Sequence, residues 1–132
     1  MTASLPPDVS EMWLQRARSD LRLGEVALFT PGVMFEDACF HAQQCAEKAL
    51  KALLSHLNIP FPRTHSIDVL LDLLQNEGIA VPIKVDEAFM LTQYAVQTCY
   101  PGEWEPVDRE EGQKALAYAS EVLEWVEENI NR

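Results

Sequence analysis

The chain has 132 residues, of which 48% are hydrophobic, which fits one globular domain with one core and excludes a disordered chain. Its formal net charge of −11 is uneven: residues 1–66 carry six Lys or Arg against seven Asp or Glu (−1), and residues 67–132 carry four against fourteen (−10). Because nucleic acids attract clustered positive charge, we expect no nucleic acid partner, and a nucleotide would have to bind the first half.

The sequence lacks the patterns of exported and membrane proteins. No apolar run approaches the roughly 20 residues that cross a bilayer, and the start of the chain has no basic segment followed by an apolar one. The three cysteines, Cys39, Cys45 and Cys99, form no Cys-x-x-Cys pair. We therefore expect a cytoplasmic protein with reduced thiols and no membrane contact.

Helical patterns begin near the start of the chain. Asp8 and Glu11 have the spacing of a capping box, and apolar or small residues then recur at helical steps. The recurring positions are Trp13, Ala17, Leu21, Gly24 and Leu28. Thr30-Pro31-Gly32 predicts the end of this helix. A second helix is expected over 34–57, because two prolines in the segment 58–62 prevent its continuation.

Helical spacing predicts three further helices. A short third helix is expected over 66–75 and a fourth over 83–98. The apolar stripe of the fourth would be Val85, Phe89, Thr92 and Val96. A second capping box, Asp108 with Glu111, opens a last helix that reaches Ile130.

These elements predict an all-α fold. No segment alternates polar and apolar residues as a half-buried strand does. The last helix has a seam with steps of three and four residues that is typical of bundles, formed by Leu116, Ala119, Leu123, Val126 and Ile130. We expect residues 1–132 to form a single domain, an up-and-down four-helix bundle with an additional short helix.

The second helix divides into two faces when its residues are placed about 100° apart. Ala, Cys and Leu residues fall on one face, and the other holds His41, Gln44, Glu47, Lys48 and Lys51. Two interpretations remain open. The polar face is either solvated, with Glu47 and Lys51 as a helical pair, or it meets another helix, another subunit or an anion.

Asp20 lies on the apolar stripe of the first helix, seven residues after Trp13. A carboxylate on such a face needs a partner, for which Lys48 and Lys51 are the candidates. We expect a structural ion pair between Asp20 and Lys48 rather than a catalytic acid.

Motifs of known enzyme classes are absent. The chain contains no Gly-rich phosphate loop, and no histidine follows a glutamate by three residues as in di-iron bundles. His41 and Cys45 lie one turn apart, but a zinc site needs further ligands and Cys39 points to the opposite side of the helix. We expect neither a metal nor a cofactor.

Four groups of residues resemble the HEPN domain family. They are Asp20-Leu21, the run Phe40–Ala52, His65-Ser66-Ile67 with Leu70-Leu71, and Tyr100-Pro101-Gly102. The resemblance extends from about Trp13 to Ile130, and Gln-Gln-x-Ala-Glu-Lys-x-x-Lys is its most specific part. It implies a four-to-five-helix bundle that forms homodimers. Family members are often small prokaryotic proteins encoded beside a minimal nucleotidyltransferase in toxin–antitoxin-like pairs; some are RNases and some have been proposed to bind nucleotides.

The chain departs from the RNase members of that family. Those members use an Arg followed, after four to six residues, by a His, and no Arg here has that spacing to a His. The nearest approach is Arg63-Thr64-His65. Cys99 stands before Tyr100-Pro101 where relatives commonly have Arg. These departures argue against RNA cleavage and weaken the case for nucleotide binding.

The leading hypothesis is a non-catalytic HEPN interaction module that forms a homodimer, pairs with a nucleotidyltransferase-type protein and binds a nucleotide weakly. Its partner surface would be the polar face of the second helix with the loop 100–104. The candidate binding residues are His41, Gln44, Lys48, Lys51, His65 and Tyr100. Two alternatives are a metal-independent RNase toxin, with His41 or His65 as acid or base and Lys48 holding the phosphate, and a nucleotide-binding regulator.

Overall fold

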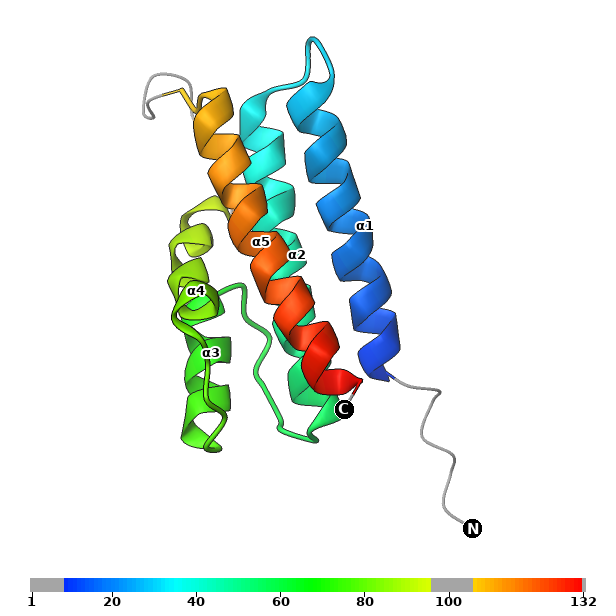
Figure 1. Ribbon diagram of the computed structural model, residues 1–132, viewed down its shortest axis with the longest axis vertical. Coiled ribbons are helices and arrows are strands. Elements are labelled where there is room, and N and C mark those ends of the chain that lie inside the picture. Colours follow the sequence, from blue (N-terminus) through cyan, green and yellow to red (C-terminus); the bar gives the residue numbers. More distant parts are fainter. Residues whose placement is uncertain (1–8, 96–105, 132) are drawn as a thin grey trace.

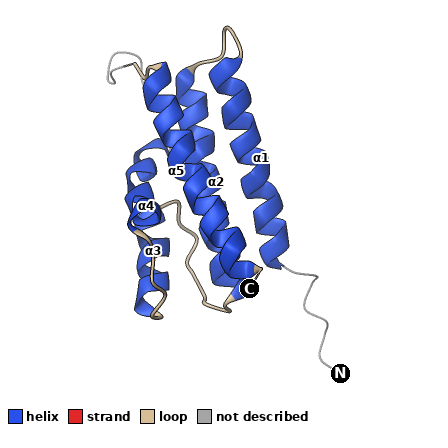
Figure 2. Ribbon diagram, in the orientation of Figure 1, coloured by secondary structure: helices blue, strands red, loops and turns tan. Residues whose placement is uncertain are grey.

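The computed structural model describes residues 9–95 and 106–131, and in this part of the chain helices are joined by loops, with no strand (Figure 2). The helices are α1 (Val9–Phe29), α2 (Phe35–His56), α3 (Ile67–Asn76), α4 (Ile83–Asp86), the 3₁₀ helix η1 (Glu87–Tyr94) and α5 (Arg109–Ile130). The expected all-α fold is therefore confirmed.

The three long helices α1, α2 and α5 lie side by side, and α3 and α4 flank them on the side away from α1 (Figure 1). Helix α2 packs against α1, α5, α3 and η1, so it is the central element of the bundle. The C-terminal part of α5 lies beside the first half of α1, where Arg18 and Glu127 form an ion pair with 2.7 Å between Nη2 and Oε2.

Small side chains allow α2 to occupy the centre. Thirteen of its 22 residues are buried, and many of them are Ala or Cys. Short side chains let neighbouring backbones approach closely. A Cβ atom added to Gly24 of α1 would lie only 3.3 Å from the backbone oxygen of Ala38 and 2.5 Å from Cδ2 of Leu116.

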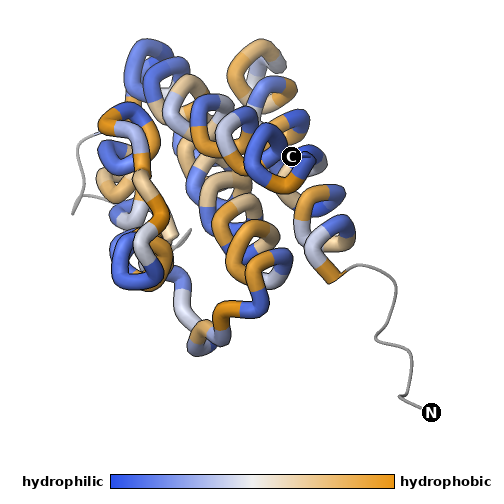
Figure 3. The backbone as a smooth tube through the Cα atoms, turned by 60° about the horizontal axis from the view of Figure 1, so that its bottom comes forward, coloured by the Kyte–Doolittle hydropathy of each residue, from blue (hydrophilic) through white to orange (hydrophobic). Residues whose placement is uncertain are grey.

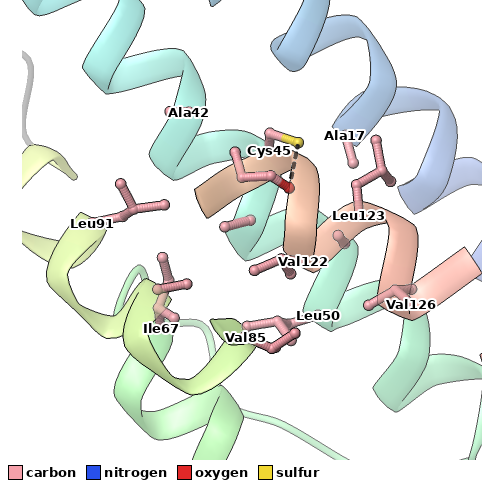
Figure 4. Close-up of a cluster of buried hydrophobic side chains, with 14 of the residues drawn as sticks. Ala17, Ala42, Cys45, Leu50, Ile67, Val85, Leu91, Val122, Leu123 and Val126 are labelled. Carbon is pink, nitrogen blue, oxygen red and sulfur yellow. Dashed lines mark hydrogen bonds between the residues drawn. The ribbon is translucent and has the colours of Figure 1, made fainter. Parts of the chain in front are cut away.

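One apolar core joins the long helices to the short ones (Figure 4). Leu50 of α2, Ile67 of α3 and Val85 of α4 meet Val122 and Val126 of α5, and all five are fully or almost fully buried. Hydrophobic and hydrophilic residues alternate along the long helices, as amphipathic helices of a bundle require (Figure 3). This core holds α4 against α5.

Apart from those of the fourth helix, the predicted helix ends agree with the structure where it describes them. Asp108 Oδ1 accepts a hydrogen bond from the Glu111 backbone N–H at 2.8 Å and caps α5. Gly32 and Gly78 adopt positive φ angles of 87° and 83° in the turns after α1 and α3, a conformation that glycine adopts without strain. Asp8, the other predicted cap, lies outside the described residues.

The long fourth helix predicted over 83–98 is wrong. The chain forms a single turn of α-helix, α4, and continues as the 3₁₀ helix η1 to Tyr94; residues 96–98 lie outside the described part. Val85, Ala88 and Leu91 are buried, and their three-residue steps match the three residues per turn of a 3₁₀ helix. Phe89, assigned to the predicted stripe, is 48% exposed.

Candidate functional site

Six polar residues of α2 form a continuous row at its border with α1 and the segment 57–66. We call this row, His41, Gln43, Gln44, Glu47, Lys48 and Lys51, the polar file. The interpretation of this face as solvated is wrong. Gln43, Glu47 and Lys51 are 0%, 2% and 7% exposed, and the other three are half-buried.

Asp20 of α1 binds one end of the polar file. Lys48 Nζ lies 2.6 Å from Asp20 Oδ2, and His41 Nδ1 lies 3.0 Å from Asp20 Oδ1. The expected ion pair of Asp20 with Lys48 is therefore present. His41 and Lys48 are seven residues apart, or two helical turns, so both side chains reach the same carboxylate.

Glu47 organises the other end of the polar file. Its Oε2 accepts a hydrogen bond from Lys51 Nζ at 2.9 Å. Its Oε1 accepts one from Gln43 Nε2 at 3.1 Å and lies 3.0 Å from His65 Nδ1. Burial favours the neutral acid, but the hydrogen bonds from Lys51, Gln43 and His65 outweigh it and lower the pKa of Glu47 below its ordinary value of 4.5.

Gln43 ties the segment after α2 to the polar file. Its Nε2 also donates to the backbone oxygen of His65 at 3.0 Å, and its Oε1 accepts from Gln44 Nε2 at 2.6 Å. Lys51 Nζ lies 5.4 Å from the ring centroid of Trp13 and 6.0 Å from that of Phe61, within cation–π range. The polar file is thus covered by α1 on one side and by the segment 57–66 on the other.

His65 is the exposed member of this network. Its side chain is 72% exposed, although Nδ1 contacts a buried carboxylate. Since the ionised Glu47 carboxylate only accepts hydrogen bonds, Nδ1 carries the proton in this contact. The other ring nitrogen of His65, Nε2, takes no part in the contact with Glu47. A carboxylate that orients an imidazole in this way is also found in enzymes that use histidine as a general base.

The structure therefore divides the predicted site residues into two groups. His41 and Lys48 contact Asp20. Glu47 gathers Lys51 and His65, and Gln44 joins this second group through Gln43. Tyr100 and Cys99 lie outside the described residues. Both lysines of the polar file have a carboxylate within 3 Å, which neutralises the charge that a phosphate would need.

The sequence did not identify Glu47 and Gln43 as the centre of this site. The spacing of Glu47 and Lys51 was a usable signal for their pairing. Spacing gave no comparable signal for Gln43, because its partner is a backbone oxygen brought near by the course of the chain after α2. The signal that could have found it is the run Gln-Gln-x-Ala-Glu-Lys-x-x-Lys, which begins at Gln43 and includes Glu47.

The two described cysteines belong to the core rather than to the site. Cys45 Sγ donates to the backbone oxygen of Ala119 at 4.0 Å and does not pair with His41. Burial, followed by the charge of Glu111, raises the pKa of the Cys39 thiol to about 12. Within the described ranges, no three His, Cys, Asp or Glu side chains are arranged to hold a metal ion, and no helix is long and apolar enough to span a bilayer.

Comparisons with known proteins agree with this architecture. A model of the HEPN domain matches residues 10–129. A Methanocaldococcus jannaschii protein named "Putative toxin MJ1304" is 29% identical over 133 residues, which cover 90% of this chain and 86% of that protein. The crystal structure of ST0689, an archaeal HEPN homologue, is similar with a TM-score of 0.75 and 30% identity, over 92% of this chain and 97% of that one. The protein thus belongs to the HEPN domain family.

Proposed function

We propose that this HEPN protein is the non-catalytic member of a toxin–antitoxin-like pair and binds a nucleotidyltransferase-type protein. Its family membership and its similarity to a protein named as a toxin support the proposal of a toxin–antitoxin-like pair. The non-catalytic part rests on one observation. Lys48 and Lys51 are both held by buried carboxylates, so neither is free to bind a scissile phosphate.

The polar file is a structural seam under this proposal. Its hydrogen bonds join α1, α2 and the segment 57–66, and no buried side-chain N or O atom in the described part of the chain lacks a partner. The sequence had suggested the polar face of α2 as the partner surface. Because this face is buried, a partner protein would bind another surface of the chain. The loop 100–104, also suggested, lies outside the described residues.

A homodimer is part of the proposal, and the outer face of α1 supports it. Met12, Leu23, Val26 and Phe29 are 53%, 48%, 47% and 65% exposed. Met12, Leu23 and Val26, with Val9, occupy two positions of a heptad repeat, the spacing by which one helix packs along another. Arg16 and Ser19 hold the same heptad positions between the two apolar pairs, so the face is apolar at its ends and polar in its middle. Uncovered apolar pairs of this kind fit a second copy of the chain.

Co-expression with a nucleotidyltransferase-type protein encoded beside this chain tests the proposal. We expect the two proteins to elute together at a mass above that of either one. Two separately eluting proteins would contradict the pairing. The same experiment with Leu23→Asp in the HEPN chain separates self-association from binding of the second protein.

An RNase remains the second candidate, because the contact of Glu47 with His65 leaves an oriented, exposed imidazole. Incubation of the purified protein with total RNA tests it, beside the variants His41→Ala and His65→Ala. The leading proposal predicts that all three preparations leave the RNA intact. Degradation that either substitution abolishes would establish the RNase instead.

A further inference from the structure

A surface groove lies between α4 and α5, away from the polar file. It has a volume of about 320 Å³, and its lining combines two kinds of residue. Ile83 and Trp125 supply apolar surface, while Glu121, Glu124 and Glu128 supply negative charge along α5, with Lys84 at the α4 side. Ile83 is 78% exposed, the largest value among the large hydrophobic residues described.

The position of Ile83 follows from the core. Val85, two residues later, is only 1% exposed and anchors α4 among the side chains of α5 (Figure 4). This anchor holds α4 close to α5 and leaves Ile83 uncovered at the rim of the groove. A large aliphatic side chain in this position gains free energy when a partner covers it.

The acidic side of the groove is unfavourable for the isolated helix. Residues 115–131 include four glutamates and no Lys or Arg, and the last turn of α5 has no basic residue. Negative charges near a helix C-terminus oppose the helix dipole, and Glu124 and Glu128 repel each other as an i,i+4 pair. Among the described residues, the ion pairs of α5 use Glu127 and Glu110, and none of them uses the three groove carboxylates.

We propose that this groove binds a basic amphipathic helix of a partner protein. The inference rests on the proposed function for the identity of that partner. Lysine or arginine side chains on the helix pair with Glu121, Glu124 and Glu128, and an aliphatic side chain packs against Ile83 and Trp125. An acidic residue at one end of the helix meets Lys84.

Spacing favours a helix over a small cation. Glu121 and Glu128 are separated by seven residues, or about 10.5 Å along α5 at a rise of about 1.5 Å per residue. Basic residues at i, i+3 and i+7 of a partner helix repeat with the same spacing. A polyamine would satisfy the carboxylates but would leave the exposed face of Ile83 uncovered.

A binding experiment on the intact protein tests the groove. The probe is a synthetic helical peptide with arginines at i, i+3 and i+7 beside a leucine stripe; its counterpart carries glutamates in place of the arginines. The groove variant is Glu121→Lys/Glu124→Lys/Glu128→Lys. The matched control is Asp72→Lys/Glu77→Lys/Glu87→Lys, which changes net charge equally at exposed positions outside the groove.

We expect the arginine peptide to bind the wild type and the control variant alike and the groove variant at least about tenfold more weakly, as loss of three charge pairs implies. Higher salt should weaken this binding. NMR signals of the Trp125 indole N–H and the Ile83 amide should shift. No binding to the wild type, equal weakening in both variants, or shifts confined to another surface would each overturn the inference.

The groove variant in the co-expression experiment separates this inference from the proposed function. Loss of the complex in the groove variant but not in the control supports both. A complex that survives in both variants contradicts the groove and leaves the pairing intact. Peptide binding at the groove without any complex supports the groove and contradicts the nucleotidyltransferase as its occupant.

Discussion

Lys51 Nζ lies 2.9 Å from Glu47 Oε2, one turn apart in α2, and the two side chains are only 9% and 3% exposed. An i,i+4 pair on a solvated helix contributes a few tenths of a kcal/mol. A buried pair behaves differently, because removal of one partner leaves an uncompensated charge in a medium of low polarity. This pair is therefore a sensitive probe of the polar file.

Replacement of Glu47 by alanine should lower the free energy of unfolding by about 3 kcal/mol, since it leaves the Lys51 ammonium buried without an anion. Urea denaturation measures the effect. The double variant Glu47→Leu/Lys51→Met removes both charges and should be closer to the wild type than Glu47→Ala is. A Glu47→Ala variant as stable as the wild type would show that the pair of Glu47 and Lys51 is solvated.

Replacement of Asp20 by asparagine should cost about 2 kcal/mol, because Lys48 and His41 lose the carboxylate that both of them contact. Glu25→Gln is the matched control. Glu25 forms an exposed pair with Arg22 at 3.9 Å, and loss of that pair should change stability by less than about 0.5 kcal/mol. Equal effects of the two substitutions would contradict a structural role for Asp20.

Protonation of Glu47 at low pH should lower the free energy of unfolding. Its pKa is lower in the folded protein than its ordinary value of 4.5, so its stabilising contribution is present above that pH and is lost as pH falls through the folded pKa. The stability difference between the wild type and Glu47→Gln should therefore be constant near neutral pH and shrink below about pH 4.5. A difference that grows on acidification would contradict this sign.

The two core cysteines should resist alkylation in the folded protein. Burial raises the pKa of Cys39 and Cys45 above the usual thiol range, so few thiolates form near pH 8. In a Cys99→Ser variant, we expect iodoacetamide to react only after denaturant is added. Rapid modification without denaturant would show that the α2 core opens readily.

Weak nucleotide binding should depend on the exposed residues Arg63 and His65 rather than on the polar file. Arg63 and His65 are both exposed, whereas Lys48 and Lys51 are neutralised by Asp20 and Glu47. Millimolar ATP should then raise the melting temperature of the wild type and not of Arg63→Ala/His65→Ala. An unchanged wild-type melting curve would remove nucleotide binding from the proposal.

Much of the fold followed from local signals. Capping residues such as Asp108, the prolines after α2 and the apolar spacing of α5 act within a few residues, so the sequence displays them directly. The stretch after Ile83 was misjudged because its residues allow both α and 3₁₀ spacing. The choice between them depends on how Ala88 and Leu91 pack against the long helices.

The candidate site could be predicted only in part. The pairing of Asp20 with Lys48 followed from the cost of placing a carboxylate on an apolar face. The burial of Glu47 and Gln43 did not, because it depends on the segment 57–66 folding back over α2 and placing His65 beside them. Contacts between residues distant in sequence leave little trace in helical periodicity.

The mass of the complex isolated from the cells that make this protein tests the central claim most directly. Native mass spectrometry of the gently purified complex should show two copies of the chain together with a nucleotidyltransferase-type protein. A chain recovered alone, or a homodimer with no second protein, would contradict the proposed pairing.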